Sequence, residues 1–224
     1  MIRFFTAPLS MFGMKVEIAL LEKAVPFERN EVSYSAVAGY SPKHPDVLRI
    51  NPKHQVPVLI HGALELFDST QIFEYLEDMT PDPPLWPAAP QQRARARLLE
   101  HKSDEVYFPH IIRLMGLQDR LADPAAMAAV DAARAYYLDM ERHIADRPYL
   151  VGAYSYADIA FYMAQVFGER LGARMTAETP RLMAWRQTVG ERAAVKATMR
   201  QLVGYLRQQA RPVPPHLQHL SATG

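Results

Sequence analysis

The chain has 224 residues and no cysteine. This absence excludes disulfide bonds, thiolate zinc sites and a cysteine nucleophile. Histidine does not restore a metal site. Of the eight histidines only His216 and His219 are closely spaced, and they lie in a proline-rich tail. We therefore expect a protein without a bound metal.

Long apolar runs and an excess of charge of one sign are also missing. No apolar run approaches the ~18 residues of a membrane span, and the N-terminus M-I-R-F-F-T-A-P lacks the apolar core of a signal peptide. The 25 basic and 24 acidic residues give a net charge of +1, which does not favour a nucleic-acid or anionic-membrane surface. We expect a cytoplasmic protein without nucleic-acid or membrane partners.

Two regions of different secondary structure are predicted. Residues 1–80 mix short strands and helices, residues 81–91 form a proline-rich linker, residues 92–208 are helical, and 209–224 form an extended tail. The fold class is therefore an α/β domain followed by an all-α domain. The elements expected in the first domain are a strand at 2–6, a helix at 15–23, a strand at 27–32, a short helix at 43–48, a hairpin of 56–60 with 64–67, and a helix opening at 68–70.

Helix starts are marked by capping residues. Asp68-Ser69-Thr70 is one such signal, and Asp123-Pro124 places a cap before a first-turn proline. Ser155 and Asp158 match the capping box [ST]-x-x-[DE] in front of an apolar run. Pro109 predicts a kink in the first long helix of the second domain.

Pro57 stands in an unusual place. It interrupts the apolar run from Val56 to Ile60, which otherwise predicts a buried strand. Proline donates no hydrogen bond to a sheet, so it is tolerated only at a strand start, an edge or a bulge.

Four segments in this order resemble the cytosolic glutathione transferase family, specifically a bacterial-type member with a serine-type active site. They are Ser10 ahead of K-V-E-I-A-L at 15–20, N-P-K-H-Q-V-P-V-L at 51–59, D-S-T-Q-I-F-E-Y-L at 68–76 and Y-S-Y-A-D-I-A at 154–160. The resemblance extends to about residue 208. It implies a thioredoxin-like N-terminal domain that binds glutathione as co-substrate. It also implies a C-terminal helical bundle with a pocket for a small hydrophobic electrophile, and a homodimer.

Ser10 is the candidate that would stabilise the glutathione thiolate. Lowering a thiol pKa from near 8.5 by two units requires roughly 3 kcal/mol. One hydrogen bond to a charged group supplies roughly 1.5–3 kcal/mol, and a helix N-terminus roughly 0.3–1 kcal/mol more. A single hydroxyl at a helix start is therefore sufficient, although Ser10 could also be a plain N-cap. Phe5-Thr6 stands where tyrosine-type relatives carry their tyrosine, and Thr6 is the alternative hydroxyl.

The resemblance implies further roles along the chain. Ser69 would bind the γ-glutamyl carboxylate at a helix N-terminus, and Asp68 would lie beside the γ-glutamyl ammonium. Either could instead be an ordinary cap. His54 and Gln55 would bind the glycine end, unless they are solvated loop residues or Lys53 substitutes for His54. The remaining expectations are a cis Val56–Pro57 bond, backbone pairing of Val56 with the cysteinyl part, and a structural role for Asp158.

Three functions follow from this resemblance. The first is an enzyme that conjugates glutathione to an electrophile, or uses it to reduce a peroxide or cleave an ether. The second is a non-catalytic stress or scaffold protein of the same fold, which the presence of both Ser10 and Ser69 disfavours. The third is a maleylacetoacetate-type isomerase, which usually carries a run like S-S-C-S-W-R where this chain has S-M-F-G-M-K.

Overall fold

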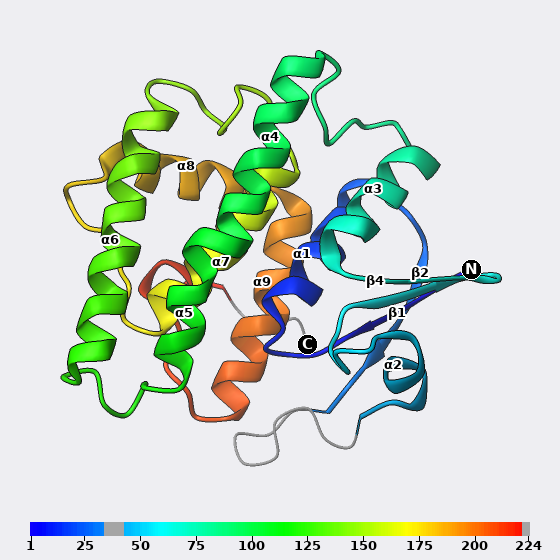
Figure 1. Ribbon diagram of the computed structural model, residues 1–224, viewed down its shortest axis with the longest axis horizontal. Coiled ribbons are helices and arrows are strands. Elements are labelled where there is room, and N and C mark those ends of the chain that lie inside the picture. Colours follow the sequence, from blue (N-terminus) through cyan, green and yellow to red (C-terminus); the bar gives the residue numbers. More distant parts are fainter. Residues whose placement is uncertain (34–42, 221–224) are drawn as a thin grey trace. The chain divides into compact units, whose positions relative to one another are not determined.

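The computed structural model describes residues 1–33 and 43–220 (Figure 1). The chain divides into two compact units. The first contains Met1–Pro83 and Ala197–Arg211, and the second contains Pro84–Lys196 and Pro212–His219. Helix α9 (Ala193–Gln208) contributes to both units, so the domain limits read from the sequence stay predictions.

The first unit is built on a four-stranded sheet. Its strands are β1 (Ile2–Thr6), β2 (Phe27–Glu31), β3 (Val58–His61) and β4 (Leu64–Phe67), in the order β2-β1-β3-β4. β1 runs parallel to β2 and antiparallel to β3, which runs antiparallel to β4. Helices α1 (Met11–Glu22) and α3 (Ser69–Met79) pack together on one side of this sheet, and α2 (Pro45–Ile50) lies on the other (Figure 1).

Alternation along β1 decides which residues face which helices. Phe5 belongs to a core with Val47 of α2 and Val58 of β3. Because successive strand residues point to opposite faces, Phe4 and Thr6 face α1 and α3. This is the thioredoxin-like arrangement that the resemblance implies, and the expected fold class is confirmed.

The register of the sheet places one end of each of three strands, β1, β3 and β4, side by side at the same edge of the sheet. Phe5 of β1 lies opposite Val58 of β3, and Val58 lies opposite Phe67 of β4. The end of β1, the start of β3 and the end of β4 are therefore neighbours. The segments that adjoin these ends hold Ser10, Val56, Pro57, Asp68 and Ser69.

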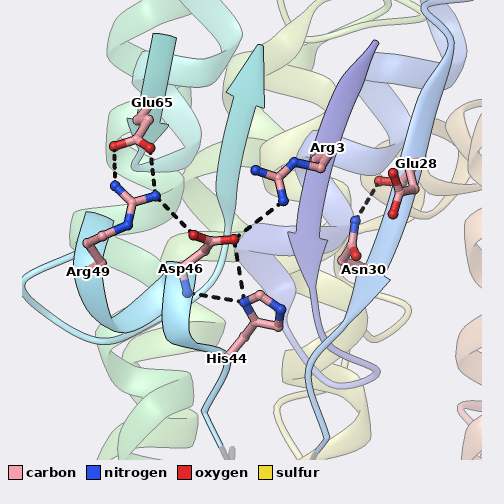
Figure 2. Close-up of polar contacts among 7 residues, drawn as sticks. All are labelled: Arg3, Glu28, Asn30, His44, Asp46, Arg49 and Glu65. Atoms are coloured by element: carbon pink, nitrogen blue, oxygen red, sulfur yellow. Dashed lines mark hydrogen bonds and ion pairs between the residues drawn. The ribbon is translucent and has the colours of Figure 1, made fainter. Parts of the chain in front are cut away.

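A network of charged side chains fastens α2 to the sheet (Figure 2). Asp46 pairs with Arg49 at 2.9 Å and with Arg3 of β1 at 3.4 Å. Arg49 also holds Glu65 of β4 through two hydrogen bonds of 2.6 and 2.7 Å. These hydrogen bonds from Arg49 lower the pKa of both Asp46 and Glu65. Because α2 ends at Ile50, the network fixes the point from which the next loop starts.

The second unit is helical. It contains α4 (Pro90–Lys102), a π-helical turn (Ser103–Tyr107), α5 (Phe108–Met115), α6 (Pro124–Ile144), α7 (Tyr156–Arg170) and α8 (Pro180–Gly190). Nearly every residue of α7 is buried, so α7 is the centre of this unit. The expected helix break lies one turn before Pro109, because the missing N–H of a first-turn proline cannot bond back into the preceding turn.

The capping box of α7 is present, and its carboxylate also joins distant segments. Asp158 accepts hydrogen bonds from the Ser155 N–H and hydroxyl at 3.0 Å each. It also accepts 2.9 Å bonds from the Leu150 N–H and the indole N–H of Trp185. The side chain is fully buried. Asp158 therefore joins the start of α7 to Leu150 and Trp185 within the second unit, and the structural role expected for it stays a prediction.

The tail departs from the extended form expected for 209–224. Pro215–Leu217 form a 3₁₀ turn, and Leu217 is buried. His216 lies 3.5 Å from Glu169 of α7, which also accepts a 2.8 Å bond from Gln165. Burial of Leu217 and the contact of His216 with Glu169 therefore hold Pro212–His219 within the second unit.

Candidate functional site

Ser10 is the N-cap of α1. Its backbone is extended, with φ −96° and ψ 104°, and its hydroxyl oxygen accepts a 3.0 Å bond from the Gly13 N–H. The residue is 5% exposed. Its hydroxyl hydrogen has no acceptor among the residues that the structure describes. Ser10 is thus an N-cap whose donor is still available, the combination that thiolate stabilisation requires.

A second hydroxyl lies close to the first. Thr6, the last residue of β1, is fully buried, and its Oγ1 has no hydrogen-bond partner within the described ranges. A Cβ on Gly13 would overlap this oxygen and lie 3.1 Å from Ser10 Oγ. Both hydroxyl oxygens therefore lie against the same face of Gly13. The glycine is required there by close approach rather than by its backbone angles.

Buried apolar side chains lie in the first turn of α1. Met11 and Met14 are each 2% exposed, so this turn is almost dry. Lys15, one turn further along the helix, is fully buried, with its ammonium 5.5 Å from the Phe12 ring and 5.1 Å from the Phe73 ring. Dry surroundings strengthen the electrostatic effect of a helix N-terminus.

The loop before β3 is shaped by Asn51, which the sequence reasoning missed. Its side chain donates to the Gln55 carbonyl at 2.6 Å and accepts from the Lys53 N–H at 2.9 Å. The backbone carbonyl of Asn51 accepts a 2.7 Å hydrogen bond from the His54 N–H. A buried Asn before Pro is a known turn signal, so the pattern N-P-K-H could have revealed it.

The same loop presents the backbone of Val56. The Val56–Pro57 peptide is cis, as expected, and β3 begins at the next residue. No hydrogen bond within the described residues uses the Val56 N–H or C=O. Both groups therefore remain able to pair with an extended ligand. His54 and Gln55 are exposed, and their side chains make no hydrogen bond or ion pair with any residue in 1–33 or 43–220.

The start of α3 completes the set. Asp68 is the N-cap, with φ +75°, and accepts from the Thr70 and Gln71 N–H groups at 3.1 and 3.3 Å. Ser69, the first helical residue, is 3% exposed. Neither its N–H nor its hydroxyl is used by a hydrogen bond inside the described part of the chain. A helix start with free donors is a general anion site.

These positions converge, with one exception. Ser10, Val56, Pro57, Asp68 and Ser69 adjoin the same edge of the sheet, and His54 and Gln55 lie in the loop that leads to it. Asp158 belongs to the second unit. Among the described residues no group of three acidic or histidine side chains could hold a metal ion. Within those same ranges no helix is long and apolar enough to span a membrane.

Comparisons with known proteins agree with this architecture. Residues 4–84 match the family model of the glutathione S-transferase N-terminal domain, and residues 105–193 match that of the C-terminal domain. A crystal structure of a glutathione S-transferase from Rhodospirillum rubrum superposes with a TM-score of 0.82 at 22% identity, covering 98% of this chain and 99% of that one.

Curated relatives include two kinds of protein. Glutathione S-transferase U25 of Arabidopsis thaliana is 30% identical over 197 residues, which is 85% of each chain. A stringent starvation protein A homolog of Haemophilus ducreyi is 28% identical over 152 residues, covering 63% of this chain and 68% of that protein. With both domain models matched in order and a 30% identical relative along most of its length, the chain belongs to the glutathione S-transferase family.

Proposed function

We propose that this protein is an active glutathione transferase of the serine type. It binds glutathione, stabilises the thiolate through Ser10 and the N-terminus of α1, and conjugates it to a small hydrophobic electrophile. Peroxide reduction or ether cleavage would use the same thiolate. The observation that carries the proposal is the Ser10 hydroxyl, which caps α1 through its oxygen and keeps its hydrogen available.

The other residues of the site would each bind a different part of the glutathione tripeptide. The N–H and hydroxyl of Ser69 would donate to the γ-glutamyl carboxylate at the positive end of α3. The exposed carboxylate of Asp68 would pair with the γ-glutamyl ammonium. The N–H and C=O of Val56 would pair with the cysteinyl part in the manner of a strand. His54 and Gln55 would contact the glycine end from the loop.

The available interactions match the energy that the thiolate requires. A hydrogen bond to a charged group is worth roughly 1.5–3 kcal/mol, and the helix dipole adds roughly 0.3–1 kcal/mol. Together they lower a thiol pKa by about two units.

Two alternatives stay open to experiment. A non-catalytic stress or scaffold protein of this fold would not need the available donors of Ser10 and Ser69, and both are present here. An isomerase of the maleylacetoacetate type is disfavoured by the apolar residues Met11 and Phe12 after the hydroxyl. Binding without turnover would support the first alternative over the transferase.

The family resemblance also implies a homodimer in the cytoplasm. Both properties stay predictions, and light scattering of the purified protein measures the mass that decides the first of them.

We predict that Ser69→Ala weakens glutathione binding by about 10-fold or more. The variant loses a hydroxyl donor to a carboxylate, which is worth roughly 1.5–3 kcal/mol. Isothermal titration calorimetry with glutathione measures the change. Ser69→Thr, which keeps the hydroxyl, is the matched control and should bind within a few-fold of wild type. Equal affinity of Ser69→Ala and wild type would place the carboxylate elsewhere.

A further inference from the structure

The hydroxyl of Thr6 makes no hydrogen bond with any residue that the structure describes. It is fully buried and unpartnered, and a buried hydroxyl without a hydrogen bond costs roughly 1–3 kcal/mol. The methyl group of a valine would fill the same space without that cost. Such an orphaned group in a folded protein calls for a functional explanation.

Its surroundings indicate which group it serves. Thr6 is the last residue of β1, on the face of the sheet that points to α1. Its hydroxyl oxygen lies against Gly13. The N–H of Gly13 donates a 3.0 Å hydrogen bond to Ser10 Oγ. Gly13 has no side chain to separate the two hydroxyls. Both hydroxyls therefore border the space that a Gly13 side chain would fill. The Ser10 oxygen has room for a second donor because a hydroxyl accepts two hydrogen bonds.

We propose that Thr6 is a positioning residue for the thiolate site, donating its hydroxyl hydrogen to Ser10 Oγ when Ser10 donates to the sulfur of bound glutathione. This inference rests on the proposed function. Ser10 Oγ would then accept from both the Gly13 N–H and the Thr6 hydroxyl, and its own hydrogen would point to the sulfur. No proton is transferred between the two hydroxyls, and the thiol proton leaves to solvent.

The hydrogen bond from Thr6 would make the Ser10 hydroxyl a stronger hydrogen-bond donor. A hydroxyl that accepts hydrogen bonds becomes more polarised, and chains of such bonds gain roughly 10–30% per bond. For a bond to a thiolate this amounts to about a 1.3- to five-fold change in the ionisation constant of the bound thiol. The benefit exists only with the thiolate present, so it is compatible with an unpartnered Thr6 hydroxyl in the structure described here.

The test compares Thr6→Val with Thr6→Ser. Thr6→Val keeps the shape and removes the hydroxyl. We expect its kcat/KM to fall by up to about two-fold at pH 7 and by up to about five-fold below the midpoint of the wild-type thiol. Its pH profile and the ultraviolet titration of bound thiolate should shift to higher pH, with the dissociation constant for glutathione unchanged. Thr6→Ser should restore the wild-type profile. Without ligand, Thr6→Val should be as stable as wild type or more stable.

Three results would overturn the inference. If Thr6→Val keeps the wild-type pH profile while Ser10→Ala shifts it, Thr6 is a spectator and the proposed function stands. If Thr6→Val instead loses stability in the absence of ligand and Thr6→Ser regains it, the hydroxyl is structural. A Ser10→Ala variant with an unchanged profile would count against the proposed function itself, and the proposed role of Thr6 would fail with it.

Discussion

Replacing Ser10 with alanine is expected to lower kcat/KM for glutathione conjugation by about 3- to 25-fold at neutral pH. The variant loses the hydroxyl of Ser10, which is the side-chain donor at the N-cap of α1. That bond to the thiolate is worth roughly 1.5–3 kcal/mol, equivalent to about one to two pKa units of the bound thiol. The affinity for glutathione should change little, because in the proposed complex Ser69 and Val56 would hold most of the tripeptide.

The pH dependence of this variant follows from the sign of the shift. Removing a donor to the thiolate raises the pKa of the bound thiol, so a smaller fraction is ionised at neutral pH. Activity of Ser10→Ala should therefore rise with pH and approach wild type where both thiols are ionised. Ser10→Thr, which retains both the cap and a hydroxyl donor, is the control. An unchanged pH profile in Ser10→Ala would mean that another group stabilises the thiolate.

Replacing Asp158 with alanine is expected to destabilise the protein by about 4 kcal/mol. Four hydrogen bonds to this buried carboxylate would be lost, from Leu150, Trp185 and twice from Ser155. Each orphaned donor costs roughly 1–3 kcal/mol where it cannot reach water, and loss of the α7 cap alone costs roughly 0.5–2 kcal/mol. Thermal unfolding should show a Tm lower by roughly 10 °C.

Asp158→Asn distinguishes the charge from the hydrogen bonds. Burial raises the pKa of Asp158 to about 6. A carboxyl whose pKa is raised in the folded state contributes stability that is fully present below its unfolded pKa and is lost as the pH rises through the folded pKa. The stability of wild type relative to Asp158→Asn should therefore grow by roughly 1 kcal/mol as the pH falls from about 7 to about 5.

The comparison between variants is necessary because other carboxyls act in the opposite direction. The pKa of Glu169 is lowered in the folded protein; burial opposes the shift, and contacts with His216 and Arg186 overcome it. Such groups lose stability as the pH falls. Denaturant unfolding of both proteins at several pH values isolates the Asp158 contribution. A difference that stays constant across this pH range, or a wild-type Tm in Asp158→Ala, contradicts the structural role given to this carboxylate.

Local signals carried most of what could be predicted from the sequence. The caps at Asp68, Asp123 and Ser155 depend on side chains within three residues of the helix start, and all three helices begin where expected. The convergence of Ser10, Val56 and Ser69 did not follow from local signals. It entered through the resemblance, and the strand register now supplies its physical basis.

Long-range contacts explain what the sequence could not show. Glu17 of α1 accepts from Arg29 of β2 at 3.2 Å and from Gln201 of α9 at 2.8 Å, across up to 184 residues of sequence. The proximity of Thr6 to Ser10 likewise requires β1 and α1 to be packed, with Gly13 between them.

Titration of glutathione bound to the wild-type protein, followed by thiolate absorbance in the ultraviolet, tests the central claim most directly. If Ser10 and the N-terminus of α1 stabilise the thiolate, the absorbance should appear with a midpoint near ~6.5, about two units below that of a free thiol. Glutathione that binds but ionises with a midpoint near ~8.5, as in free solution, would contradict the claim.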